Sequence, residues 1–309
     1  IYFKIYLFEM LMHLYLFFYL ILFNSFSYSF LFKHLFRKKI QQNDHKYTIF
    51  HNKEKKSFKY NNINDYFYDN KYLENKKIIN IYPAGIKGFY EMGLCTYIKK
   101  NNNLENIVFS GASAGAWNAL LLAYKGDVLE FKKIIFDIPY KDYDSIFQIQ
   151  QKIKQTILSH FTSDDFNLKQ LFVGLTALDN FKFKTFIYTD FESLEDALNC
   201  IIGSSNIPFI TGKLFYFYKG RLSFDGGFKK DPFIHHPSKS IYIHPCVFNK
   251  NNILNDDTHK ASNISDCSII ENNEFIVDNE TFIKLFIQGY NDALNNKDII
   301  QKNLQSQIP

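Results

Sequence analysis

Short apolar runs, each followed by a loop of small residues and then by a helical pattern, dominate the middle of the chain. Residues 77–82 form the first apolar run, and residues 83–88 form the loop that follows it. A second run at residues 107–109 leads into a small-residue turn at 111–115 and a helical pattern over 114–124. Two strand–loop–helix units in tandem predict parallel strands with helical crossovers, and therefore an α/β layered fold.

The hydrophobic pattern predicts further elements on both sides of these units. A helical pattern over 89–100 completes the first unit, and helical periodicity continues over most of residues 127–172. Within it, Asp164 and Asp165 are expected to cap a helix that runs through Leu171. The other predicted elements are a strand at 182–189, a helix at 193–202, a hairpin at 214–218 and 222–224, a strand at 239–244, a polar excursion at 250–279 and a closing amphipathic helix at 280–296.

The chain before the first unit is predicted to lie outside the globular part. Residues 5–23 are nearly all apolar, and Lys33 and three basic residues at 37–39 follow them. A signal peptide, a membrane anchor and an interfacial segment all fit this pattern, and we favour an anchor or an uncleaved signal over residues 1–39. If the segment spans a bilayer, the basic residues would keep the rest of the chain on the cytoplasmic side. Residues 40–76 are polar and predict a linker.

The composition narrows the class of function more than the class of fold. The formal net charge of +5 is spread along the chain without a focused basic stripe, which argues against nucleic acid as a partner. A mild positive charge suits an anionic membrane surface. Cys95, Cys200, Cys246 and Cys267 lie far apart and form no C-x-x-C pair, so we expect free thiols and not a metal site or a disulfide scaffold.

The turn at residues 111–115 reads Gly-Ala-Ser-Ala-Gly, which is a G-x-S-x-G motif. It stands where a strand ends and a helix begins, and in that context the motif lifts a serine hydroxyl above the edge of a sheet. The flanking glycines leave room for a tight backbone at Ser113, and the helix start that follows favours an anion. Ser113 is therefore the candidate nucleophile.

A serine hydroxyl is a weak nucleophile and requires a base, and the residues alone leave two kinds of candidate open. Asp225 ends an apolar run and precedes Gly226 and Gly227, so its carboxylate has room at a strand end. However, Asp-Gly is also the commonest pair of a type I′ hairpin turn, which would give Asp225 a structural role only. The candidates for a histidine base are His160, His235, His236, His244 and His259.

Three motifs follow one another in a fixed order. They are Pro-Ala-Gly-Ile-Lys-Gly at 83–88, Gly-Ala-Ser-Ala-Gly at 111–115 and Asp-Gly-Gly at 225–227. Together they resemble the patatin-like phospholipase family, whose pattern is a G-G-G-x-[KR]-G loop, a G-x-S-x-G elbow and a D-G-[GA] turn. The blocks at 191–209 and 289–293 are also similar to that family, the first through its ending Gly-Ser-Ser-Asn-Ile-Pro-Phe.

The resemblance covers about residues 77–296, and it implies a patatin-like catalytic domain there, with residues 297–309 as a C-terminal tail. It implies a three-layer α/β/α fold with a mostly parallel central sheet. It also implies a lipid acyl hydrolase that cleaves carboxylic esters of glycerophospholipids or neutral glycerolipids at a membrane or lipid-droplet surface, without a metal or an organic cofactor. Together with residues 1–39, this predicts a membrane-associated protein with a cytoplasmic catalytic domain, and a cleaved signal or organellar targeting are the alternatives.

Individual residues receive roles through this resemblance. Ser113 would attack the ester carbonyl, and Asp225 would accept its proton and later activate water. The backbone N–H groups of Ala84, Gly85 and Ala114 would form the oxyanion hole. Lys87 occupies the position of the family's basic residue, and the matching motif glycines are Gly88, Gly111, Gly115, Gly226 and Gly227.

The first loop departs from the family pattern. Pro83 and Ala84 stand where the family has its first two glycines, and proline has no N–H, so one potential donor is lost. Two alternatives therefore stay open beside the Ser–Asp dyad. One is an α/β-hydrolase with a Ser–Asp–His triad, and the other is a catalytically inactive, membrane-bound binding protein that keeps the fold.

Overall fold

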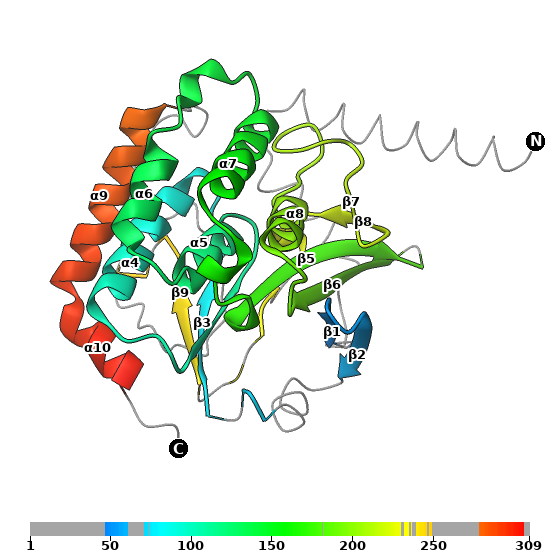
Figure 1. The fold of residues 1–309 in the computed structure, drawn as a ribbon, viewed down its shortest axis with the longest axis horizontal. Helices are drawn as coiled ribbons and strands as arrows, with labels where there is room; N and C mark the ends of the chain where they lie inside the picture. The colour runs from blue at the N-terminus through cyan, green and yellow to red at the C-terminus, as the bar shows by residue number, and fades with distance from the viewer. Residues whose placement is uncertain are drawn as a thin grey trace, which may run out of the picture. The chain divides into compact units, whose positions relative to one another are not determined.

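The computed structural model describes residues 47–60, 71–73, 75–180, 182–229, 232–234, 236, 239–245, 247–248 and 278–305 (Figure 1). The predicted anchor or signal at residues 1–39 lies outside these residues, as does nearly all of the predicted excursion at 250–279. Among the described helices, none combines the length and the apolar character that crossing a bilayer requires.

Four buried parallel strands form the centre of a mixed sheet. They are β3 (Lys77–Ile81), β4 (Ile107–Gly111), β5 (Leu171–Asp179) and β9 (Ser240–Ile243), in the order β9-β3-β4-β5. The register places Ile81 beside Gly111, so the loops that leave β3 and β4 start side by side at one edge of the sheet.

Both antiparallel and parallel pairs extend the sheet beyond β5. β6 (Lys182–Thr189) is antiparallel to β5, β1 (Tyr47–His51) is parallel to β6, and β2 (Lys56–Tyr60) forms the end of this order. A short hairpin of β7 (Phe217–Tyr218) and β8 (Arg221–Phe224) joins the sheet through β8, which is antiparallel to β5. This hairpin carries Asp225 to the edge where β4 ends.

The two faces of the sheet belong to two separate apolar cores. Ile79 and Phe109 point to one face and pack into the larger core, which includes the helices. On that face α5 (Ala114–Ala123) and α8 (Leu194–Ser204) pack against the strands, and α4 (Gly88–Asn101) packs against α5. Ile78 and Val108 point the other way and pack with Leu73 in a second core. The strands are thus buried on both sides, as parallel strands usually are.

Outer helices complete the helical part of the molecule. They are α6 (Val128–Phe136), α7 (Ile146–His160), α9 (Asn279–Asn295) and α10 (Lys297–Gln305). α9 lies alongside α4 (Figure 1). A Cβ at Gly93 would lie 2.1 Å from the carbonyl oxygen of Phe286, and one at Gly289 would lie 2.0 Å from that of Tyr90. Only glycine at these two positions permits so close a contact.

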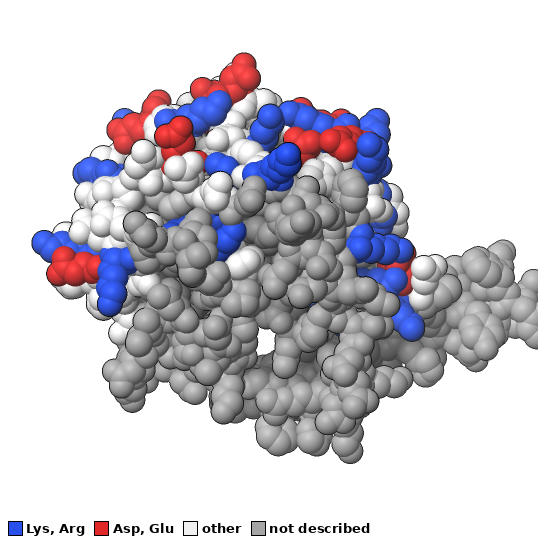
Figure 2. All heavy atoms as spheres, turned by 90° about the horizontal axis from the view of Figure 1, so that it is seen from below, with Lys and Arg blue, Asp and Glu red and all other residues white. Residues whose placement is uncertain are grey.

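Surface charges of both signs are mixed. In Figure 2, Lys and Arg side chains lie among Asp and Glu side chains over the described part of the face shown. Ion pairs include Lys284 with Glu280 at 2.6 Å and Lys154 with Glu195 at 2.8 Å. Exposed pairs of this kind contribute little to stability, so the apolar cores are the main source of cohesion.

The predicted three-layer α/β class with a mostly parallel central sheet is confirmed, and both strand–loop–helix units form where the pattern places them. The predicted helix through Leu171 is wrong. Residues Ser163–Asp165 and Leu168–Gln170 form single 3₁₀ turns, and the central strand β5 begins at Leu171. This strand is buried on both faces over its first seven residues, so its sequence lacks the alternation by which a half-buried strand is recognised.

Two further stretches differ from the prediction. The polar stretch at 40–76, predicted as a linker, contributes β1 and β2 to the sheet, and Ile49 of β1 is fully buried. The stretch at 297–309, predicted as a tail, begins with α10, in which Ile300 is buried. The Lys77 ammonium donates to the carbonyl oxygen of Asn303 at 2.6 Å, so this helix is tied to the start of β3.

Candidate active site

The turn between β4 and α5 holds Ser113 in an unusual backbone conformation. Its φ is 54° and its ψ is −128°, a region that side chains other than glycine enter at a cost of roughly 1–3 kcal/mol. The flanking glycines are required by packing. A Cβ at Gly111 would lie 2.2 Å from the carbonyl oxygen of Gly115, and one at Gly115 would lie 2.2 Å from that of Ile81 in β3. The motif therefore fits the sharp turn that the sequence predicts.

A second serine fixes the backbone of this turn. The N–H of Ser113 donates to the Ser204 hydroxyl at 2.8 Å, and that hydroxyl donates to the carbonyl oxygen of Gly174 at 2.6 Å. Ser204 is fully buried at the end of α8. The elbow is thus tied to β5 through one hydroxyl, and the N–H of Ser113 itself is already engaged.

Asp225 lies next to the Ser113 hydroxyl. It follows β8 directly, is 5% exposed, and accepts a hydrogen bond from the N–H of Gly227 at 2.7 Å. Burial raises the pKa of Asp225 to about 6, although the nearby Ser113 hydroxyl and the N–H of Gly227 act in the opposite direction. The carboxyl is therefore mainly ionised at neutral pH and is a much stronger base than an exposed aspartate.

The hairpin-turn interpretation of Asp225 does not hold. A type I′ turn requires positive φ at both central residues, here Asp225 and Gly226. Asp225 has a φ of −48°, and Gly226 has no positive φ either. Asp225 instead caps the single 3₁₀ turn Gly226–Phe228. A Cβ at Gly226 would lie 2.6 Å from the carbonyl oxygen of Gly174, so the first of the two glycines lets this turn approach the sheet.

The loop after β3 lies beside the elbow. Gly85 has a φ of 54°, and a Cβ there would meet nothing within 4 Å, so glycine is needed for its backbone and not for space. Ala84 has a φ of −133°, which an alanine adopts without strain. Within the described part of the chain, no hydrogen bond uses the N–H groups of Ala84, Gly85 or Ala114 as donors. Pro83 thus removes one donor without disturbing the two that follow it.

Asn118 joins the two helices that begin at this site. Its amide donates to the carbonyl oxygen of Gly88 at 2.9 Å and, more weakly, to that of Ala114 at 3.4 Å. A Cβ at Gly88 would lie 2.7 Å from the Cβ of Ala114. The first turns of α4 and α5 are therefore packed against each other and held in a fixed relation.

One cavity of about 1050 Å³ brings the predicted site residues together. Ser113, Asp225, Ala84, Gly85 and Ala114 all line it. Gly88 and Lys87 line it too, whereas the motif residues Gly111, Gly115, Gly226 and Gly227 serve packing or backbone hydrogen bonds behind it. The rest of the wall is mainly apolar and includes Trp117, Leu121, Phe131, Ile135, Ile149, Ile153 and Ile157.

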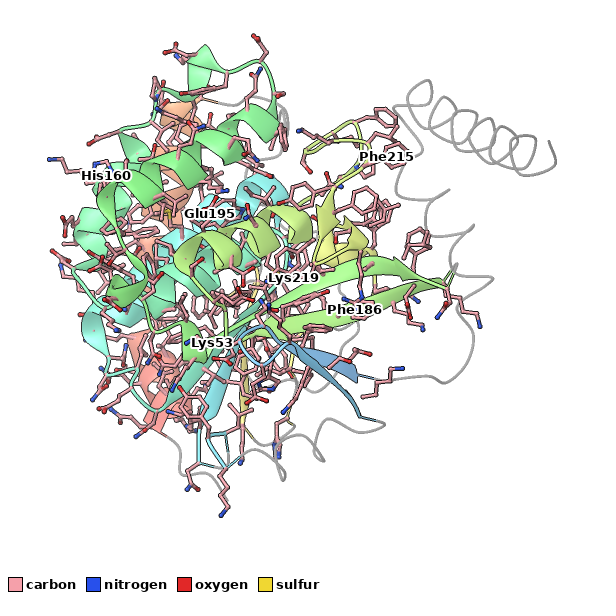
Figure 3. The ribbon with its side chains drawn as sticks, turned by 45° about the vertical axis from the view of Figure 1, so that its right-hand side comes forward. Lys53, His160, Phe186, Glu195, Phe215 and Lys219 are labelled. Atoms are coloured by element: carbon pink, nitrogen blue, oxygen red, sulfur yellow. The ribbon has the colours of Figure 1, made fainter. Side chains whose placement is uncertain are left out.

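None of the described histidines lines this cavity. His160 is the last residue of α7 and is exposed (Figure 3). His244 packs edge-on against Tyr82 with ring centroids 5.8 Å apart, and burial lowers its pKa to about 4. His235 and His259 lie outside the described residues. Among the histidines described, none is therefore placed to act on Ser113.

Sequence reasoning missed Ser204 and Asn118 as parts of the site. Ser204 stands in the Gly-Ser-Ser-Asn-Ile-Pro-Phe block that resembles the family, but nothing in that block announces a bond to a residue 91 positions away. Asn118 reads as one polar residue in an apolar helix, which is the signal that could have marked it. The helices α6 and α7 were predicted as helices, but not as a wall of the cavity.

Residues 84–236 match the sequence model of a family described as Patatin-like phospholipase. The matched stretch contains Ser113, Asp225 and the loop from Ala84 onward, so the resemblance predicted from the motifs is confirmed. No curated protein matches the chain.

Proposed function

Because the chain carries a domain of the patatin-like phospholipase family, whose members are lipid acyl hydrolases, we propose that it cleaves carboxylic esters of glycerolipids through Ser113 and Asp225. The observation that carries the proposal is the position of the buried Asp225 carboxyl beside the Ser113 hydroxyl in one largely apolar cavity. A nucleophile, a base of raised pKa and unengaged N–H donors meet there, which is the set that acyl transfer requires.

In the first half of the reaction, the Ser113 oxygen attacks the ester carbonyl while Asp225 accepts its proton. The negative oxygen of the tetrahedral intermediate accepts hydrogen bonds from the N–H groups of Gly85 and Ala114, with Ala84 as a third donor. Such donors lower the barrier by roughly 3–4 kcal/mol each in other hydrolases. The C–O bond then breaks, and Asp225 returns the proton to the leaving alcohol.

In the second half, water hydrolyses the acyl-enzyme. Asp225 removes a proton from a water molecule, whose oxygen attacks the acyl carbonyl at the site that the alcohol has left. The second intermediate collapses, the Ser113 oxygen recovers the proton, and the fatty acid departs. The raised pKa of Asp225 suits both halves, because the group must take up and release one proton in each of them.

The apolar wall supports a fatty acyl group as the part of the substrate that enters the cavity. Side chains such as Phe131, Ile149 and Ile157 cannot form hydrogen bonds with polar groups of a substrate. Transfer of an alkyl chain from water to such an apolar wall is favourable. Esters with these chains reside in membranes and lipid droplets, so we propose that the protein acts at such a surface.

A fluorophosphonate probe tests the proposal directly, because it forms a covalent bond only with an activated serine. We expect labelling at Ser113, identified by peptide mass, and hydrolysis of a dissolved short-chain ester. The Ser113→Ala variant is the control and should show neither. If the protein is folded and the probe does not label Ser113, the protein is the inactive binding protein, the alternative that the Pro83 substitution suggests.

A further inference from the structure

The segment at residues 207–218 exposes four large apolar side chains close together in the sequence. Phe217 is 63% exposed, Phe209 55%, Ile210 49% and Phe215 48%. Phe217 and Phe209 have the largest exposed fractions among the large apolar side chains that the structure describes. A stretch of this kind on a soluble surface usually marks an interaction site.

The first part of the segment is held rigidly outward. Phe209 has a φ of 66°, which is a strained conformation for a bulky side chain. The carbonyl oxygen of Ile207 accepts from the N–H groups of Ile210, Thr211 and Gly212, so the turn is closed by hydrogen bonds. The exposure of Phe209 is therefore built into the backbone and is not the result of a loose loop.

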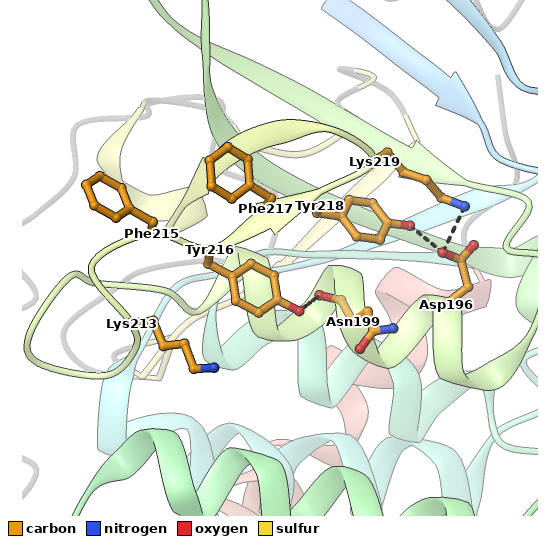
Figure 4. Close-up of a pocket in the computed structure, with 8 residues that line it drawn as sticks. All are labelled: Asp196, Asn199, Lys213, Phe215, Tyr216, Phe217, Tyr218 and Lys219. Atoms are coloured by element: carbon orange, nitrogen blue, oxygen red, sulfur yellow. Dashed lines mark hydrogen bonds and ion pairs between the residues drawn. The ribbon is translucent and has the colours of Figure 1, made fainter.

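The second part ends in the short strand β7, and two tyrosine hydroxyls fix it to α8. The hydroxyl of Tyr216 donates to the carbonyl oxygen of Asn199 at 2.9 Å, and that of Tyr218 donates to the Asp196 carboxylate at 3.0 Å, both on α8. Phe215 and Phe217 alternate with these tyrosines in the sequence, and both point away from α8 (Figure 4). Figure 3 shows Phe215 at the margin of the part of the chain that the structure describes.

The charged side chains within the segment and its next residues are all basic. Residues 207–222 contain Lys213, Lys219 and Arg221 but no Asp or Glu. Lys219 pairs with acidic residues of the α8 region, and Arg221 lies over aromatic rings. Lys213 lies 5.1 Å from the centre of the Phe147 ring, and no acidic partner for it is found in the described part of the chain. A positive charge beside apolar side chains complements an anionic lipid headgroup above acyl chains.

The segment is also continuous with the active-site cavity. Phe209 and Ile210 line the cavity that contains Ser113, while Phe215 and Phe217 do not. We propose that residues 207–218 dock on an anionic phospholipid bilayer, with Phe215 and Phe217 inserted among the lipids and Phe209 and Ile210 at the entry of the acyl chain. As a route for substrate this rests on the proposed function, whereas the docking itself can be tested without catalysis.

The test uses the full chain with Ser113→Ala, so that vesicles stay intact. Phe217→Trp is introduced, and the protein is mixed with phosphatidylcholine–phosphatidylserine vesicles that contain acyl-chain-brominated phosphatidylcholine, which quenches a tryptophan within the bilayer. The parent with Trp117 alone gives the background. Ile287→Trp on α9, at a side chain that is 50% exposed, is the matched control. We expect quenching at position 217 and none beyond background at position 287.

Equal quenching at both positions, or none at position 217, would overturn the proposal, and it would do so whatever the segment at residues 1–39 contributes to binding. Lys213→Gln should weaken binding to anionic vesicles about fivefold, since a lysine near such a surface is worth about 1 kcal/mol. Equal binding to neutral vesicles would contradict the choice of an anionic surface.

A second measurement separates docking from catalysis. In the chain with Ser113 intact, Phe215→Ser with Phe217→Ser should lower hydrolysis of vesicle lipid at least about tenfold, because two exposed phenylalanines lose their burial in lipid. Hydrolysis of a dissolved short-chain ester should be unchanged. Quenching at position 217 without any ester hydrolysis would support the docking surface and reject the proposed function. Ester hydrolysis without quenching would support the proposed function and reject the docking surface.

Discussion

Two strand–turn–helix units lie side by side at the centre of the sheet, and each passes through one residue with a φ of 54°. In the unit of β3 and α4 that residue is Gly85, and in the unit of β4 and α5 it is Ser113. The same backbone angle is thus free of strain in one unit and strained in the other. In the proposed mechanism, the first unit presents only N–H groups, whereas the second presents a hydroxyl.

The difference also appears in what supports each turn. Ser113 is held by Ser204 through its N–H, its hydroxyl lies beside Asp225, and its flanking glycines are tightly packed. Nothing lies within 4 Å of the place where a Cβ of Gly85 would be. A strained residue needs surroundings that over-determine it, while a glycine at the same angle does not.

Ser113→Gly gives both turns the same residue at this backbone angle and should have the largest effect. Ser113→Gly should abolish ester hydrolysis, with a loss of about a thousandfold or more, as for other serine nucleophiles. It should also be more stable than Ser113→Ala by about 1 kcal/mol, because glycine relieves the strained φ. Urea denaturation of both variants measures this difference. A glycine variant less stable than the alanine variant would show that Ser113 is not strained.

Asp225→Asn is expected to reduce hydrolysis by a similar factor, since an amide cannot accept the proton. Its effect on stability should depend on pH. Because the pKa of Asp225 is raised from 3.8 to about 6 in the fold, the native state holds the proton more tightly, and its stability falls as the pH rises from about 4 to about 6. At neutral pH the asparagine variant should therefore be more stable, by up to about 3 kcal/mol.

Chemical denaturation at pH 4 and pH 7 measures this difference between wild type and variant. The two proteins should be closer in stability at pH 4 than at pH 7. An advantage of the variant that is independent of pH would show that ionisation of Asp225 is not its source, and retained hydrolysis would exclude Asp225 as the base.

Gly85→Ala is the reverse of Ser113→Gly, because it places a side chain at a positive φ in the loop after β3. We expect a loss of roughly 1 kcal/mol of stability and a tenfold to hundredfold lower kcat, as one oxyanion donor moves. Gly220→Ala is the matched control, because Gly220 also has a positive φ of 75° with nothing near a Cβ, and it does not line the cavity. It should lose similar stability and keep its activity on a dissolved ester. Equal kinetics in the two variants would exclude Gly85 from the oxyanion hole.

Ser204→Ala is expected to have the smallest effect on turnover. It leaves the N–H of Ser113 and the carbonyl of Gly174 without their shared partner, which costs about 1–3 kcal/mol of stability, and a shifted elbow should lower kcat about tenfold. Ser223→Ala removes another fully buried hydroxyl, which bonds to the carbonyl oxygen of Arg221 away from the cavity. Identical kcat values in Ser204→Ala and Ser223→Ala would show that Ser204 stabilises the fold without positioning Ser113 for catalysis.

The sequence predicts what depends on neighbours along the chain. The elbow at 111–115, the loop at 83–88 and the turn at 225–227 are each encoded within a few residues, and the structure brings their members into one cavity. The meeting of Ser113 with Asp225 could be predicted only through the family's ordered motifs. On residues alone, a hairpin turn explained Asp225 equally well.

What the sequence does not predict depends on distant partners. Strand β1 carries few aliphatic residues and gains its place from pairing with β6, more than a hundred positions away. Strand β5 lacks alternation because both of its faces are buried. The bond from Ser113 to Ser204 needs α8 to end beside β4, and that follows from the packing of the whole sheet.

The contact between Gly115 and Ile81 gives the serine motif a wider meaning for protein design. The place of a side chain at position 115 is occupied by the backbone of β3, the neighbouring strand. The motif therefore depends on the contact between the β3 and β4 units as well as on the turn between β4 and α5. Transferring the elbow to another scaffold would require transferring β3 and its loop as well, since the five residues alone lack the backbone against which Gly115 packs.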